Sequence, residues 1–261
     1  MFGSSSTEQF KVRYSTDYPE NYQLSADRRY LVIKLGPESH ASVHATDRSR
    51  EPLGKVQFEL PATGLKKFFR SKPQFDDLAM ADALFDVTDA GKTLTVLFNN
   101  SEKPRIEQFA LPSGRCLSSQ PLAEGTISSY GRVLNVLCQV VSGGSRLAVV
   151  TASAAAVLDI ATGKRVFYLD KETAQCESAD YFGACSPDGK FPAITGQKDS
   201  RDADWRIQLW DVEKAERIGT FVADGVVGEM RFEEDGRTVV FGMGNGRICR
   251  LAAEAGSGSV D

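Results

Sequence analysis

The chain has 261 residues, of which 41% are hydrophobic and 25% charged, a balance typical of a globular protein that can bury a core. Its formal net charge of −4 provides no overall basic field for nucleic acid or for an anionic membrane. No stretch approaches the roughly 20 apolar residues of a membrane span, and no signal-peptide pattern opens the chain. The five cysteines are scattered without a C-x-x-C pair, which favours reduced thiols and a cytoplasmic location.

In chain order, the first candidate strand is EQFKVRY (8–14), in which apolar and polar residues alternate. A turn followed by a mostly apolar stretch then comes at SADRRYLVI (25–33). The same pattern recurs in TDAGKTLTV (88–96), SGGSRLAVV (142–150), SPDGKFPAI (186–194) and EEDGRTVVF (233–241), and the fifth position is always basic: Arg29, Lys92, Arg146, Lys190 and Arg237. The later copies recur near the ~40–50 residues of one propeller blade.

The turn chemistry of SPDG predicts a strand on each side of it. Pro187 fixes φ for the first central position of a turn, Asp188 can bond to nearby backbone, and Gly189 tolerates positive φ. A second turn follows most of these copies, in HATDRSREPLGKVQF (44–58), FALPSGRCL (109–117), VLDIATGKRVFYL (157–169) and LWDVEKAERIGTF (209–221). Two hairpins make a sheet of about four antiparallel strands. Such a sheet must stack on neighbours to bury both faces.

We therefore predict an all-β protein, a single β-propeller domain over residues 1–261. The predicted blades span about 20–60, 82–121, 130–170, 179–222 and 227–255, with an insertion at 61–81. The outer strand of the fifth blade is missing from this pattern. Two completions stay open: segment 8–14 supplies that strand and closes the ring, or the chain is part of a larger ring. Pro192, inside an expected strand, predicts a bulge or a late strand start.

The fourth unit resembles a known family. SPDGK followed by WRIQLWDVEKAERIGTF (205–221) resembles the WD40 repeat, whose namesake dipeptide is present as Trp210–Asp211, and GMGNGRICRL (242–251) is similar to part of another repeat. Trp-Asp occurs in one unit only, and the Gly-His dipeptide of the family is absent, so its internal Asp–His–Ser–Trp hydrogen-bond network cannot be complete. The resemblance implies a non-catalytic scaffold that presents loops to a protein or peptide.

Two loops are the candidate binding segments. GLKKFFRSK (64–72) is basic and QFDDLAMADALFDVTD (74–89) is acidic, and this insertion should share one rim with DSRDADW (199–205). The alternatives are that the phenylalanines cap the core and that the second loop is simply solvated. The predicted partner-binding residues are Lys66, Lys67, Phe68, Phe69, Arg70, Lys72, Asp199, Arg201, Asp202, Asp204 and Trp205.

Residues for catalysis are scarce. The only histidines are His40 and His44, which on a strand lie too far apart for one metal, and no nucleophile elbow or phosphate loop is present. We expect no enzyme activity, cofactor, metal, nucleic acid or membrane partner. One alternative is a quinone-dependent dehydrogenase, because AAAVLDIATGKRVFYL (154–169) also resembles a blade of that class, although the chain has only Trp205 and Trp210. Another is a structural propeller fragment of a larger assembly.

Overall fold

A computed structural model describes residues 22–35, 40–47, 52–57, 83–99, 103–125, 127, 137–151, 154–174, 183–197 and 205–252. Strands and turns dominate these ranges, which confirms the all-β prediction. The helical segments described are α2 (Lys171–Ala174) and the single turns η1 (Asp89–Gly91) and η2 (Ser142–Gly144). None of the helices described is long and apolar enough to cross a lipid bilayer.

The strands form five antiparallel sheets in chain order. Sheet 1 contains β1 (Tyr22–Leu24), β2 (Tyr30–Leu35), β3 (His40–Ala45) and β4 (Gly54–Gln57). Sheet 2 contains β5 (Ala83–Thr88), β6 (Thr93–Phe98), β7 (Arg105–Ala110) and β8 (Arg115–Pro121). Sheet 3 contains β9 (Leu137–Val141), β10 (Arg146–Val150), β11 (Ala154–Asp159) and β12 (Arg165–Asp170).

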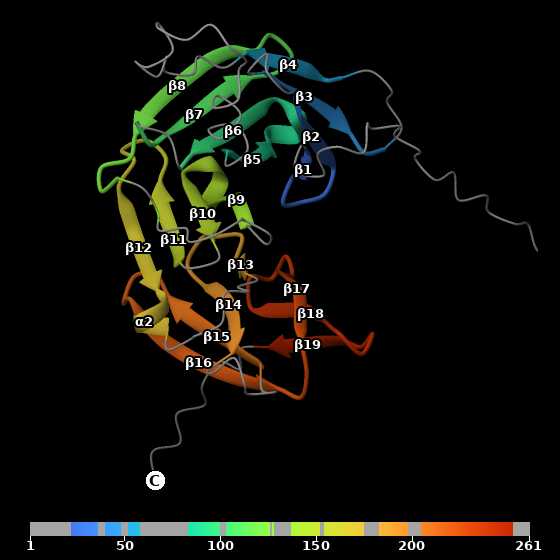
Figure 1. Ribbon diagram of the computed structural model, residues 1–261, viewed down its shortest axis with the longest axis vertical. Coiled ribbons are helices and arrows are strands. Elements are labelled where there is room, and N and C mark those ends of the chain that lie inside the picture. Colours follow the sequence, from blue (N-terminus) through green and yellow to red (C-terminus); the bar gives the residue numbers. More distant parts are fainter. Residues whose placement is uncertain are drawn as a thin grey trace, which may run out of the picture.

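Sheet 4 contains β13 (Gly183–Cys185), β14 (Pro192–Gln197), β15 (Trp205–Asp211) and β16 (Glu216–Ala223). Sheet 5 has three described strands, β17 (Val227–Phe232), β18 (Thr238–Met243) and β19 (Ile248–Ala252). Each sheet falls on one of the units expected from the sequence, and β16 ends one residue beyond the expected bound of 222. The first strand of each sheet contacts the first strand of the next, from β1 through β5, β9 and β13 to β17, so the sheets are arranged in a propeller-like way (Figure 1).

An apolar cluster lies between each pair of consecutive sheets. The clusters between sheets 1 and 2 and between sheets 2 and 3 contain Phe85 and Leu147, respectively. Those between sheets 3 and 4 and between sheets 4 and 5 contain Trp210 and Phe241. Because both faces of a middle sheet pack on neighbours, some of its strands are buried along nearly their whole length instead of alternating. This is seen in β5 and β11, where nearly every side chain is buried.

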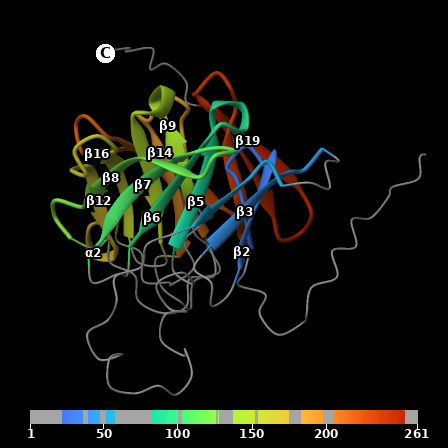
Figure 2. The ribbon, with the colours of Figure 1, turned by 90° about the horizontal axis from the view of Figure 1, so that it is seen from above.

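The strand ends define two rims, on opposite edges of the sheets (Figure 2). Rim A carries the turns between first and second strands and between third and fourth strands. Rim B carries the links between second and third strands and from each fourth strand to the next sheet. The longest links, residues 58–82, 122–136 and 171–182, all leave from rim B. The predicted insertion at 61–81 belongs to this rim and lies outside the described residues.

Two details of the strand ends bear on what was predicted from the repeat: one agrees with the prediction and one differs from it. Pro192 is the first residue of β14, which confirms a late strand start. The third copy is displaced by one residue from its predicted alignment. In sheets 1, 2 and 4, the backbone carbonyl of the basic residue accepts a hydrogen bond from the next turn; these residues are Arg29, Lys92 and Lys190. In sheet 3, the carbonyl of Ser145 accepts this bond. Arg146 instead pairs with Val141 at the start of β10. The adjacent Gly143 and Gly144 made the register of this turn ambiguous in the sequence.

Candidate functional site

The predicted partner-binding residues are placed by the structure in one case only. Trp205, the first residue of β15, is 6% exposed and packs in the cluster between sheets 4 and 5. Its indole belongs to the core, so the expectation of a surface contact there is corrected: the residue begins an interior strand instead of ending a loop. The other ten lie outside the described residues and stay predictions: Lys66, Lys67, Phe68, Phe69, Arg70, Lys72, Asp199, Arg201, Asp202 and Asp204.

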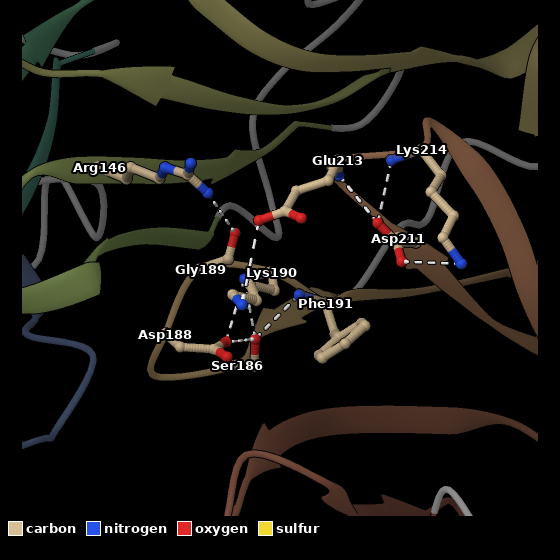
Figure 3. A network of polar contacts seen from close by, with 9 residues as sticks. All are labelled: Arg146, Ser186, Asp188, Gly189, Lys190, Phe191, Asp211, Glu213 and Lys214. Atoms are coloured by element: carbon tan, nitrogen blue, oxygen red, sulfur yellow. Dashed lines mark hydrogen bonds and ion pairs between the residues drawn. The ribbon is translucent and has the colours of Figure 1, made fainter. Parts of the chain in front are cut away.

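The rim A turn of sheet 4 is held by its own polar side chains (Figure 3). Ser186 Oγ donates to Asp188 Oδ1 at 2.6 Å and accepts from the backbone N–H of Phe191 at 2.9 Å. The hairpin turn beside it is capped by Asp211, whose Oδ1 accepts from the backbone N–H groups of Glu213 and Lys214 at 2.9 and 3.0 Å. The aspartate of the Trp-Asp dipeptide therefore stabilises a turn.

Contacts between turns join sheets 3 and 4 on the same rim. Arg146 Nη1 of β10 donates to the backbone carbonyl of Gly189 at 3.4 Å, and the N–H of Ser142 donates to the carbonyl of Pro187 at 2.8 Å. Within sheet 4, Lys190 Nζ lies 4.0 Å from Glu213 Oε1. Figure 3 shows these charged groups directed at neighbouring turns. Several polar groups of rim A in this region therefore take part in turn geometry or in contacts between turns.

A row of polar side chains on the first strands links consecutive sheets. Gln23 of β1 bonds to both backbone groups of Phe85, donating to its carbonyl at 2.9 Å and accepting from its N–H at 3.1 Å. In sheet 3, Gln139 Oε1 accepts from the N–H of Cys185 at 3.4 Å. The register with the second strand makes Gln23, Asp86 and Gln139 equivalent positions. This row was not predicted from the sequence, although each member lies two residues before the rim A turn.

Asp86 is the member that joins three sheets. Its Oδ1 accepts from the N–H of Ala26 in sheet 1 at 3.0 Å and of Val87 at 2.9 Å, and its Oδ2 accepts from the N–H of Val140 in sheet 3 at 2.7 Å. Burial raises the pKa of this carboxyl to about 6, against the three backbone bonds, which lower it. Burial, and then the charge of Asp86, also raise the pKa of the neighbouring Cys138 thiol. A thiol held neutral is an inert structural group.

The histidine region shows one side-chain pair. Ser42 Oγ and His44 Nε2 lie 3.0 Å apart on the same face of β3. Burial, and then the nearby Lys55, lower the pKa of His44, which favours the neutral ring. The side chain of His40 lies outside the described residues. Within the ranges described, no group of three His, Cys, Asp or Glu side chains is placed to hold a metal ion.

The stretch that resembles a quinone-enzyme blade forms the rim A turn of sheet 3. Asp159 Oδ1 accepts from Thr162 Oγ1 at 2.6 Å and from its N–H at 2.8 Å, and these bonds lower the pKa of Asp159. Gly163 has φ of +66°, and a Cβ there would overlap the carbonyl oxygen of Pro121 in β8. The Asp-x-x-Thr-Gly sequence thus fits a turn that packs closely on the outer strand of sheet 2.

Comparison with known proteins adds one finding about the fold. No protein-family model matches the chain, and no curated protein matches it. Among solved structures, it is similar to a chain of Kuenenia stuttgartiensis hydrazine synthase, with a TM-score of 0.52 and 13% sequence identity. The match covers 94% of this chain and 69% of the other. This likeness supports the propeller-like fold and carries no activity across.

Proposed function

We propose that this chain is a non-catalytic β-propeller of WD40 type, whose rim B loops bind a protein or peptide partner. The observation that carries the proposal is the structural difference between the two rims. The described turns of rim A bond to one another, whereas the long links all leave from rim B, above sheets tied by apolar clusters and by Gln23, Asp86 and Gln139. Loops on such a rigid base are a common solution for recognition.

The WD40 assignment is supported by how Trp210 and Asp211 are used. Trp210 packs on Phe167 of sheet 3 with ring centroids 6.2 Å apart, and its Nε1 donates to the buried Gln208 at 3.2 Å. Gln208 in turn donates to the carbonyl of Ala174 in α2 at 2.7 Å. A tryptophan of one sheet therefore anchors it to the preceding one, through a partner different from the histidine-containing network of the family.

Charge reversal on the two rims tests the binding proposal. The rim B variant changes Lys66, Lys67, Arg70 and Lys72 to Glu. The matched control makes the same number of changes on rim A, at Arg29, Lys92, Lys190 and Arg237, all on exposed turns. Crosslinking and quantitative mass spectrometry should show a protein captured at least about tenfold less by the rim B variant, and captured normally by the control. The assignment to rim B is contradicted if the natural protein, the rim B variant and the rim A control capture the partner equally, or if only the control loses capture.

The quinone-enzyme alternative has its own test. A quinone enzyme reconstituted with its cofactor absorbs visible light and reduces a dye when given an alcohol or sugar. The motif that suggests this class is accounted for by the turn at Asp159 and Gly163, and both tryptophans are buried between sheets. We expect neither absorbance nor turnover. Either signal, lost on substitution of Asp159, would favour the enzyme.

A further inference from the structure

Three of the described turns share one framework, in which an aspartate or asparagine is followed by a glycine with positive φ. The side-chain oxygen accepts a hydrogen bond from the backbone N–H two residues later: Asp188 from Lys190 at 3.1 Å, Asp235 from Arg237 at 2.8 Å and Asn245 from Arg247 at 3.1 Å. The glycines have φ of +72°, +65° and +83°. Asn245, in the rim B turn between β18 and β19, is the only asparagine of the sequence that precedes a glycine. The turns therefore share a geometry, and one of them carries a neutral amide.

An asparagine that precedes a glycine can react with its own backbone. The nitrogen of Gly246 can attack Cγ of Asn245, because the glycine has no Cβ to obstruct closure of the ring. A carboxylate in the same place resists this attack, because it already carries a negative charge. At Asp235, hydrogen bonds from the backbone N–H groups of Arg237 and Thr238 lower the pKa of the carboxyl and keep it ionised. The asparagine turn is thus the reactive member of the three.

The surroundings of Asn245 favour the reaction. The turn is exposed, and a Cβ built on Gly246 would meet no atom within 4 Å. The bond from the Arg247 N–H reaches Oδ1, the oxygen on which negative charge develops during the attack. The nitrogen that would leave, Nδ2, has no hydrogen-bond acceptor among the described residues. One contact opposes the attack: the N–H of Gly246 donates to the carbonyl of Met243 at 2.9 Å, so this bond must open first.

We propose that Asn245 is a site of spontaneous deamidation on rim B. The backbone nitrogen of Gly246 forms a bond to Cγ of Asn245, its proton passes to the departing amide nitrogen, and ammonia leaves. Water, the one co-reactant, then opens the cyclic imide at either carbonyl carbon, which gives aspartate or isoaspartate. The product adds a negative charge to rim B, and the iso form also adds a methylene to the main chain between β18 and β19. This covalent change does not depend on partner binding at rim B.

Peptide mapping of the full chain after incubation at mildly alkaline pH tests the site. Trypsin releases residues 238–247 as one peptide, which should gain about 1 Da at Asn245 and separate into aspartate and isoaspartate forms. The native protein should react no more than about tenfold more slowly than urea-unfolded protein, because one exposed hydrogen bond has to open. Asn245→Gln is the matched control: it keeps a neutral amide, must close a larger ring and should stay unmodified. Asn245→Asp supplies the reference for the aspartate product.

A second variant separates opening of the turn from unfolding of the whole chain. Ile106 is buried in sheet 2, so Ile106→Ala destabilises the fold without touching the turn. Local opening predicts the same rate of modification in this variant as in the natural protein. An acceleration that matches its loss of stability shows that only the unfolded chain reacts, and overturns the proposal. It is also overturned if the native protein stays unmodified while the unfolded protein reacts, or if the Asn245→Gln peptide gains the same mass.

Discussion

Sheets 2 and 3 are joined by strand contacts and a buried cluster, whereas the described contact between sheets 5 and 1 is an ion pair. Between sheets 2 and 3, Ile106 and Leu147 share a buried cluster, and Asp86 bonds across to β9. Between sheets 5 and 1, the described residues contribute the ion pair of Arg28 and Glu229, while Ile248 stands in the open. Ile106 and Ile248 are the same residue type at the equivalent position of the third strand, paired with Leu97 and Gly242. The packing of a neighbouring sheet, and not the side chain itself, therefore decides whether this position is buried.

The largest difference in stability is expected between two alanine substitutions at the equivalent position of the third strand, one in sheet 2 and one in sheet 5. Ile106→Ala should lower the free energy of unfolding by about 2–5 kcal/mol, because it empties a fully buried site. Ile248→Ala should cost less than about 1 kcal/mol, because that side chain is mostly exposed. Urea unfolding of both variants measures the difference. Equal losses would mean that both contacts are sealed alike.

The pH dependence of stability should depend on Asp86. The pKa of its carboxyl is raised in the fold from 3.8 to about 6. The fold therefore favours the neutral carboxyl. The contribution of Asp86 to the free energy of unfolding is fully present below pH 3.8 and is lost as pH rises through about 6, and this loss amounts to about 3 kcal/mol by pH 7.

Asp86→Asn removes this titration. The stability advantage of the natural protein over the variant should shrink as pH rises from 4 to 7, as measured by urea unfolding at each pH. Asp159→Asn, on an exposed turn, is the matched control and should leave the trend in place. A constant difference between pH 4 and 7 would contradict the assignment. The charge of Asp27 also raises the pKa of Asp86, and the charge of Asp86 in turn raises the pKa of the Cys138 thiol.

Close packing of turns on outer strands should give an intermediate effect. Gly163→Ala introduces a Cβ that overlaps the Pro121 carbonyl, at a φ that side chains rarely adopt, so we expect a loss of about 2 kcal/mol. Ala215 holds the equivalent position in sheet 4 with φ of 53°, and Ala215→Gly should instead be neutral or stabilising by up to about 1 kcal/mol. Thermal unfolding distinguishes the two, and a stable Gly163→Ala protein would refute the close approach.

The smallest effect is expected at the contact of sheets 5 and 1. Arg28→Ala should change the free energy of unfolding by less than about 0.5 kcal/mol, because both partners of the ion pair are exposed to solvent. A double-mutant cycle with Glu229→Ala isolates the pair. A coupling energy above about 1 kcal/mol would show that the two sheets are joined more tightly than these contacts allow.

The strands could be predicted from the turn residues of the sequence. The contacts of individual side chains such as Asp86 could not. Asp188–Gly189 and Asp235–Gly236 mark strand ends through local bonds, so the five sheets follow from short patterns. Asp86 is one polar residue in a mostly apolar strand. It joins the sheets by accepting hydrogen bonds from backbone N–H groups of sheets 1 and 3, which are distant from it in the sequence. Trp205 was predicted at a surface because it follows a charged loop, whereas the strand it begins is buried.

Site-resolved amide hydrogen exchange tests most directly whether sheets 1 to 5 seal one another in succession and leave the last face less covered. We predict that the amides of β10 and β11 exchange only through global unfolding, whereas those of β18 and β19 exchange through local opening, at least about tenfold faster. Uniform protection across sheets 3 and 5, with β19 as slow as β11, would contradict it.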